Sequence, residues 1–502
     1  MKICGPLKMT MAIFIAAIFL IRPYFLQSRG MWYVGDDYDY FAHSSAIVFG
    51  QYPCYKKEFY TIAKEGPQSP IGPGILASPF VFVFSLLDRA QASTIVAART
   101  QDNIVGSWSQ FGFQVASVFY FIFACYLLFF GISRFVPSSS ASTAVILMMV
   151  CQGLPLFVYR RPFFSHCSEF FIQSALMYFF LEFMAGKLHA DAGQKDRKDA
   201  TKLITGVCAF SGLLYLTRPN DIGYALIWPL LVMDYSKGII PLMLESRTGI
   251  LLFAGLMLIF KFWPETVNHM HPYAWAGGYL GFHMTIGDLG RRIVHILIGT
   301  DWGLIFTAPF FLISFVGLFF LKRLSKRFRW LLVPMAVNLY VIIAWGSQGG
   351  WYGYRYLIVS AIPVMTLPLA FLLEWISKKI RGWGVILIML MALPPVLSMI
   401  AFETHDYFNL QIFPVDFHRS DWTNPDLQVN IWSCLIHFPG SFCLLVFQGL
   451  LALVYSARGM APPLTQVTWV RVLIILFLPW LMWGGSSIIS NLICIFRRKI
   501  IK

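Results

Sequence analysis

The sequence predicts an all-α polytopic integral membrane protein with about 11 to 13 transmembrane helices. Of its 502 residues, 58% are hydrophobic and 13% are charged, whereas a soluble domain has about 25% charged residues. Apolar runs recur along the whole chain, and the basic residues gather in short segments between them. The net charge of +15 therefore follows the positive-inside tendency of membrane proteins, and no nucleic-acid partner is expected.

The apolar runs give the predicted spans, with boundaries good to a few residues. The first run follows Lys2 and Lys8 and has no clear small-residue cleavage site after it, so we interpret it as an uncleaved first span. The predicted spans are 9–27, 110–133, 142–159, 167–186, 203–216, 222–236, 249–263, 303–321, 330–345, 354–375 and 383–401, with about two more near 441–456 and 472–496.

The most basic loops are predicted to face the cytoplasm. They are Gly186 to Lys202, Leu321 to Arg329, and the group Lys378, Lys379 and Arg381. Counting the apolar segment Ile71 to Leu87 as a span would invert every later loop. Because this segment opens with prolines and glycines, we expect an interfacial helix on the outer surface. The basic C-terminus then falls outside, so either the last segment is a hairpin or one late span is miscounted.

With this orientation, the polar, aromatic and glycine-rich segments all fall on the outer side. They are 36–70, 159–166, 217–221, 264–301, 346–354 and 403–430. A transporter tends to place polar residues and broken helices near the bilayer midplane. Polar residues gathered at one face favour surface chemistry over transport.

An acidic cluster follows the first span directly. Asp36, Asp37 and Asp39 lie within Gly35 to Tyr40, where carboxylates at the membrane–water boundary can stay charged and meet a lipid headgroup. The alternative is that they only solvate the end of a helix. Catalysis at a lipid-linked substrate remains the functional hypothesis for Asp36 and Asp37.

Arginines at outer helix ends run against the positive-inside tendency and need another reason. Arg160 and Arg161 precede His166 and Glu169, and Arg218 lies in the short turn Thr217 to Asp221. A guanidinium group matches phosphate oxygens well, although snorkelling to lipid headgroups is the simpler explanation. His166 remains open as an acid, a base, a metal ligand or a helix cap.

A glycine- and aromatic-rich segment, Gly349 to Tyr356, opens a later span. Its Trp351 and Tyr352 can stack on a sugar or a prenyl chain, and Arg355 can pair with phosphate, although an ordinary aromatic belt has the same composition. The histidines of the second long outer segment, His269, His271 and His283, lack a clear third ligand, so no metal site is predicted.

Taken in order, these segments resemble the GT-C superfamily of polytopic glycosyltransferases, and most closely bacterial members of the protein-mannosyltransferase and aminoarabinose-transferase type. The resemblance covers about residues 1–400. It rests on Gly35 to Gln51, Ser69 to Phe80, Phe164 to Phe171, Leu216 to Asn220, Thr300 to Leu304 and Trp351 to Tyr356.

The resemblance, which ends near residue 400, and the later apolar spans together predict two parts to the chain. Residues 1–401 would form the catalytic membrane module, with 28–109 as the first outer loop and 264–301 as the second long outer loop. Residues 402–502 would add a C-terminal outer loop and the final transmembrane helices.

The resemblance also implies an inverting transfer of a sugar from a polyprenyl-phosphate donor to a hydroxyl group on a lipid, glycan or protein. The base would be Asp37 or Asp36, and the family pattern favours Asp37. Arg160, Arg161, Arg218 and Arg355 would bind the phosphate, supported by His166, Tyr352 and Trp351.

No cofactor is expected beyond a weak possibility of a divalent metal. The expected location is a bacterial inner membrane, with the active site facing the periplasm or exterior. The alternatives are a transporter or flippase of lipid-linked saccharides, or another lipid-modifying transferase.

Overall fold

A computed structural model describes residues 36–53, 69–90, 108–150, 152–159, 162–188, 195–226, 247–267, 286–298, 304–323, 331–345, 355–380, 384, 387–388 and 390–392. Within these residues the chain is helical and no strand occurs, as the sequence predicts. The α-helices are α2 (Asp36–Val48), α3 (Gly72–Ala90), α4 (Trp108–Ile132), α5 (Ser138–Val150), α6 (Leu154–Tyr159), α7 (His166–Leu188), α8 (Lys195–Thr217), α11 (Arg247–Met257), α12 (Trp263–Val267), α14 (Ile286–Ile298), α15 (Leu304–Thr307), α16 (Pro309–Gly317), α17 (Leu332–Trp345) and α18 (Arg355–Ile380). The 3₁₀ segments η3 (Pro219–Leu226) and η5 (Leu318–Arg323) and the π turn η4 (Leu258–Phe262) connect or extend them.

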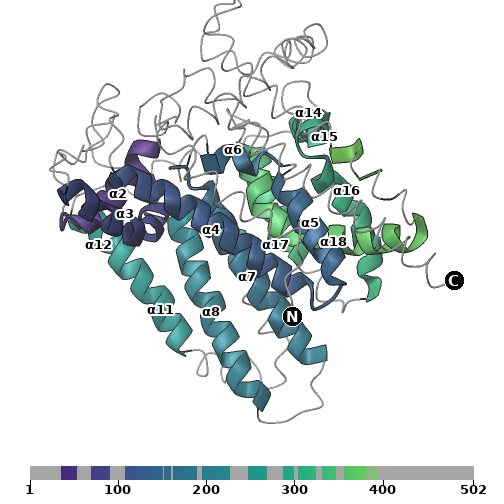
Figure 1. Cartoon of the computed structure of the whole chain (residues 1–502), viewed down its shortest axis with the longest axis horizontal. Coiled ribbons are helices and arrows are strands. Elements are labelled where there is room, and N and C mark those ends of the chain that lie inside the picture. Colours follow the sequence, from purple (N-terminus) through teal and green to yellow (C-terminus); the bar gives the residue numbers. More distant parts are fainter. Residues whose placement is uncertain are drawn as a thin grey trace, which may run out of the picture.

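The long helices pack side by side as a bundle (Figure 1). Helix α7 packs against α4 and α8, while α3 packs against α4 and α11 against α8. Helix α18 packs against α5, α7 and α16, and η3 packs against α8 and α17. The helices thus form two groups, a first of α3, α4, α8 and α11 and a second of α5, α16, α17 and α18. Helix α7 and segment η3 contact members of both groups.

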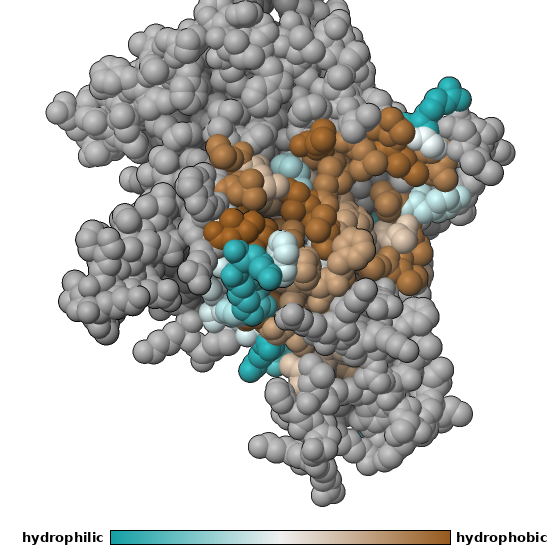
Figure 2. Space-filling view, turned by 90° about the vertical axis from the view of Figure 1, so that its right-hand side faces the viewer, coloured by the Kyte–Doolittle hydropathy of each residue, from teal (hydrophilic) through white to brown (hydrophobic). Residues whose placement is uncertain are grey.

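The surface of the bundle is unusually apolar. Helix α4 and the segment Val359–Ile380 of α18 are long and apolar enough to cross a membrane. Large apolar side chains are exposed on several helices, including Phe82, Phe119 and Leu251. The described part of the face in Figure 2 is mostly hydrophobic. Such a surface suits lipid better than water, in agreement with an integral membrane protein.

Helices α2 and α3 pack closely on each other and on the end of α8. A Cβ atom built on Gly72 would lie 2.7 Å from the backbone nitrogen of Thr217, and one built on Gly74 would lie 3.0 Å from the backbone nitrogen of Ser44. Only glycine permits these approaches. The start of α3 is thereby held against both α2 and the turn that follows α8.

Two side chains of α2 fix the residue that precedes α3. The backbone N–H of Ser69 donates to Oδ2 of Asp39 at 2.9 Å, and the Nε2 atom of His43 lies 2.8 Å from the carbonyl oxygen of Ser69. Burial lowers the pKa of His43 from 6.5 to about 4, although the bond to Ser69 acts in the opposite direction. The neutral imidazole therefore donates from Nε2, and α2 is clamped to the start of α3.

The structure corrects several predicted boundaries. The predicted span 142–159 is broken at Gln152 and Gly153, where Gly153 takes a positive φ of 74°. The predicted loop from Gly186 to Lys202 is largely helical, because α7 continues to Leu188 and α8 begins at Lys195.

Two further boundaries differ. The start of the predicted span 222–236 is the 3₁₀ segment η3 over its described residues, and Lys378 and Lys379 lie in the last turn of α18. Helices run on through basic residues because Lys and Arg are good helix formers.

Helix α3 coincides with the predicted interfacial segment, and its level in a membrane stays a prediction. The predicted spans 9–27, 441–456 and 472–496 lie outside the described residues, and the division at residue 401 also stays a prediction.

Candidate functional site

The candidate site begins on the first turns of α7. His166, Glu169 and Gln173 have spacings of three and four residues, so they lie on one face of the helix. The backbone N–H of Glu169 donates to the carbonyl oxygen of Ser165 at 2.8 Å, which starts the helix. All three side chains are buried.

The second part of the site is the turn after α8. Pro219 cannot continue the helix, so α8 ends at Thr217 and the chain turns into η3. The backbone N–H of Asp221 donates to the carbonyl oxygen of Arg218 at 3.0 Å. This tight turn presents Arg218 and Asp221 together to the buried face of α7.

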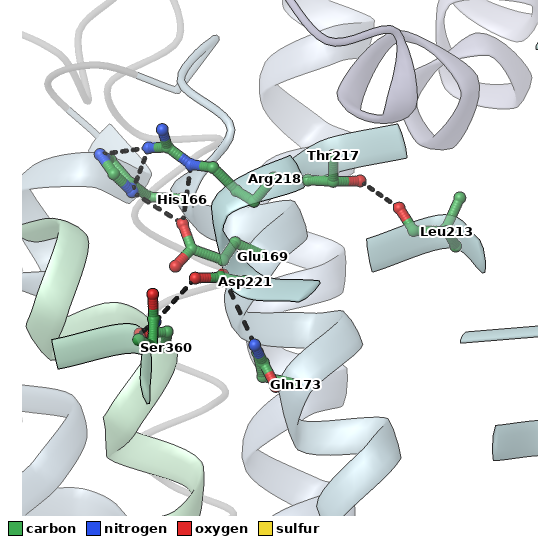
Figure 3. Close-up of polar contacts among 9 residues, drawn as sticks. His166, Glu169, Gln173, Leu213, Thr217, Arg218, Asp221 and Ser360 are labelled. Carbon is green, nitrogen blue, oxygen red and sulfur yellow. Dashed lines mark hydrogen bonds and ion pairs between the residues drawn. The ribbon is translucent and has the colours of Figure 1, made fainter. Parts of the chain in front are cut away.

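The two parts meet in a cluster of charged and polar side chains (Figure 3). The Nε atom of Arg218 donates to Oε2 of Glu169 at 3.1 Å, and an Nη2 atom lies 3.1 Å from Nδ1 of His166. Nδ1 of His166 also lies 3.2 Å from Oε2 of Glu169. Nδ1 must lack a proton to accept from Arg218 and carry one to donate to Glu169. Only one of these two contacts is therefore a hydrogen bond at any moment.

Asp221 extends the cluster to the second group of helices. Its Oδ1 accepts from Nδ2 of Asn338 at 2.8 Å, and Nδ2 of Asn338 also donates to Oγ of Ser360 at 2.7 Å. On the other side, Nε2 of Gln173 lies 3.5 Å from Oδ2 of Asp221. Asp221 therefore contacts α7 and α17 directly and is linked to α18 through Asn338.

Two buried carboxyl groups, those of Glu169 and Asp221, lie in this cluster together with the guanidinium group of Arg218. Burial disfavours the charged form of a carboxyl group. Burial raises the pKa of Asp221 from 3.8 to about 6, although Arg218, Asn338 and Gln173 lower it.

Helix α2 lies at the same end of the bundle. The ring of Phe41 is 5.7 Å from that of Phe163, which lies in the turn just before α7. Asp37 is four residues before Phe41, so both point to the same face of α2, and Asp37 is buried. With Gly72 against Thr217, these contacts place the Asp37 helix beside the turns that carry His166 and Arg218.

The structure thus tests only some of the predicted site residues. It brings His166 and Arg218 into contact and places Asp37 in the first turn of α2. Asp36 and Arg355 lie in helices, but their side chains are outside the description. Arg160, Arg161, Trp351 and Tyr352 lie outside the described residues.

Several residues in the cluster had no predicted role. Glu169 follows His166 by three residues, and Asp221 follows Arg218 by three residues, and these spacings were the available signals. Asn338 and Ser360 are polar residues within apolar runs, which in membrane proteins are usually paired or functional. Among the described residues, no group of three His, Cys, Asp or Glu side chains is arranged to hold a metal ion.

Comparisons with known proteins give similarities of structure alone. No protein-family profile and no curated protein sequence matches the chain. One similar solved structure is ArnT from Cupriavidus metallidurans bound to undecaprenyl phosphate, with 13% identity over 95% of this chain and 77% of that chain and a TM-score of 0.48. Another is an Archaeoglobus fulgidus oligosaccharyltransferase in complex with Zn and sulfate, with 12% identity over 81% of this chain and a TM-score of 0.41. This chain spans only 58% of that second protein.

Both similar proteins are GT-C glycosyltransferases, the superfamily that the sequence segments resemble. At these identities and TM-scores the similarity does not extend to substrate, mechanism or site residues. A proposal for the function of this protein therefore rests on the side chains of the cluster around His166, Glu169 and Arg218.

Proposed function

We propose that the protein is a membrane glycosyltransferase that moves a sugar from a polyprenyl-phosphate donor to a hydroxyl acceptor with inversion at the anomeric carbon. The observation that carries the proposal is the meeting of three segments at one end of an apolar bundle. These are the Asp37 helix α2, the start of α7 and the Arg218 turn.

The reaction requires a base for the acceptor hydroxyl and a cation for the leaving phosphate. The acceptor oxygen forms a bond to the anomeric carbon as the bond from that carbon to the phosphate oxygen breaks, and the polyprenyl phosphate leaves with the electron pair. Asp37 takes the acceptor proton, which general base catalysis requires. A cation near the leaving phosphate stabilises its growing charge.

Arg218 is the cation that the described cluster offers for that phosphate. Its bond to Glu169 fixes the direction of the guanidinium group, and the Nε–H used for this bond is one of five N–H groups on that side chain. Arg160, Arg161 and Arg355 remain proposed partners, supported by Trp351 and Tyr352. The charged groups of the cluster lie at helix ends, which favours this function over a transporter with a midplane site.

The test is transfer from a panel of radiolabelled polyprenyl-phosphate sugars by the purified protein in lipid vesicles. At least one donor should lose its sugar to a hydroxyl acceptor, with inverted configuration in the product. Failure with every donor and acceptor, while the protein stays folded, would remove the proposal.

A companion measurement tests the phosphate role. Arg218→Met should weaken binding of the bare polyprenyl phosphate by about tenfold or more, the usual value of a charge-assisted bond. The double change Glu169→Met with Arg218→Met removes both members of this buried ion pair. Arg134→Met is the control, because Arg134 is exposed and pairs with Glu182 in the turn after α4. Equal affinities in all four proteins would exclude Arg218 from phosphate binding.

A further inference from the structure

Two glutamine side chains near the candidate site are buried and have no hydrogen-bond partner among the described residues. Neither the amide nitrogen nor the amide oxygen of Gln114 in α4 has a hydrogen-bond partner among the described residues, and the same holds for Gln152, in the turn between α5 and α6. Gln114 is 0% exposed and Gln152 is 2% exposed. Buried polar groups in native proteins are nearly always paired, so each such amide calls for an explanation.

Gln114 lies on a helix that packs against both α5 and α6, and Gln152 lies in the turn between these two helices. Gln114 and Cys125 are 11 residues apart, about three turns, so they share a face of α4. The Sγ atom of Cys125 lies 3.6 Å from Sδ of Met149, near the end of α5. That face of α4 therefore points towards α5. Gln152 follows just after α5, and α6 packs against α4 as well.

The same region borders the candidate site. The neighbour of Gln114 in sequence, Phe113, has its ring 4.8 Å from that of Phe163, and Oγ of Ser117 donates to the carbonyl oxygen of Pro162. The ring of Phe157 in α6 lies 4.6 Å from the imidazole of His166. Phe113, next to Gln114, and Phe157, five residues after Gln152, thus contact the turn before α7 and the first residue of α7, His166.

Primary amides are suited to one class of ligand at such a position. Each amide donates two hydrogen bonds and accepts two, and a sugar hydroxyl both donates and accepts. A prenyl chain would leave the amides unpaired, and phosphate, which carries only acceptors at its ionised oxygens, would satisfy only their donors. A polyhydroxylated ring is the ligand that pairs both ends of both amides.

We propose that Gln114 and Gln152 form a sugar-binding subsite that recognises the hydroxyl groups of a pyranose or furanose ring beside the His166 and Arg218 cluster. The ring belongs either to the lipid-linked donor or to a glycan acceptor. This inference rests on the proposed function for the identity of the ligand, and its test separates the two sources.

The test measures sugar recognition in Gln114→Met and Gln152→Met, which keep the length of the side chain and remove its polar atoms. Binding is measured for bare polyprenyl phosphate, for its mannosyl, glucosyl and aminoarabinosyl forms, and for free methyl glycosides. The matched control is Ser142→Ala, because Ser142 is also buried without a partner among the described residues but lies near the other end of α5.

Each glutamine variant should lose about tenfold of the preference for the sugar-bearing ligand over the bare lipid. Its affinity for bare polyprenyl phosphate should be unchanged, and its melting temperature should not fall. A loss confined to lipid-linked sugars indicates the donor, and a loss confined to methyl glycosides indicates the acceptor.

Unchanged sugar preference together with a lower melting temperature would overturn the proposal and indicate a structural role. Wild-type protein that binds none of the sugars would overturn it as well. Sugar binding that depends on Gln114 without any transfer would instead remove the proposed function and leave the subsite in place.

Discussion

The ion pair between Glu169 and Arg218 gives a prediction with a definite size. Both side chains are buried, and Oε2 of Glu169 accepts from Nε of Arg218 at 3.1 Å. In Glu169→Met the guanidinium group keeps its burial and loses the carboxylate that accepts its Nε–H bond. Removing one partner of a buried pair typically costs about 3–5 kcal/mol of stability. At about 2 °C for each kcal/mol in a large protein, the melting temperature should fall by about 6–10 °C.

The double variant Glu169→Met with Arg218→Met distinguishes the cost of leaving one charge unpaired from the cost of losing the two side chains. It removes one negative and one positive charge and fills the space with apolar atoms, which is often neutral or stabilising. We expect it to melt within about 2 °C of the wild type, so the two changes should be strongly non-additive.

The natural control is the ion pair between Arg134 and Glu182. Glu182 also lies on α7, but the side chain of Arg134 is 52% exposed. Glu182→Gln should cost less than about 1 kcal/mol, because exposed pairs are screened by solvent. The assay is thermal unfolding of the purified protein in detergent. If Glu169→Met lowered the melting temperature no more than Glu182→Gln, the reasoning about the buried cluster would be refuted.

Two other predictions concern the packing around the start of α3. Since the pKa of His43 falls from 6.5 to about 4 on folding, the unfolded chain binds more protons between these pH values. The contribution of neutral His43 to the free energy of unfolding is therefore complete above pH 6.5. It falls by about 3 kcal/mol in total as the pH drops to 4. His43→Gln should flatten this part of the stability–pH curve, and an unchanged slope would contradict the assignment. Gly72→Ala places a Cβ atom 2.7 Å from the backbone nitrogen of Thr217 and should cost about 1–3 kcal/mol in thermal unfolding. The control Gly255→Ala meets no atom within 4 Å, so it should be neutral or stabilising, and equal effects would remove the close-packing argument.

Hydropathy predicted the helices well, because apolar runs of span length must form helices in lipid. It also anticipated that the segments with His166 and Arg218 lie at the same end of the bundle. The boundaries were less accurate. Hydropathy cannot distinguish a loop from a charged extension of a helix, and the basic start of α8 from Lys195 is such an extension.

The partners within the cluster could not be predicted from the sequence. Asp221 and Asn338 are 117 residues apart, and their contact depends on how η3 packs against α17. Glu169 was visible beside His166, but its spacing did not show that it would hold Arg218. No role for Gln114 or Gln152 could be predicted from the sequence, because a lone glutamine in an apolar run belongs to no motif. Their significance comes from their burial without a hydrogen-bond partner among the described residues.

The proposed mechanism requires Asp37 as the base. In lipid vesicles containing an accepted donor, Asp37→Asn should lower the rate of sugar transfer by at least about 100-fold, the usual contribution of general base catalysis. Donor affinity should be retained. If Asp37→Asn, Asp36→Asn and the double variant all transferred sugar at the wild-type rate, the proposed mechanism would be wrong.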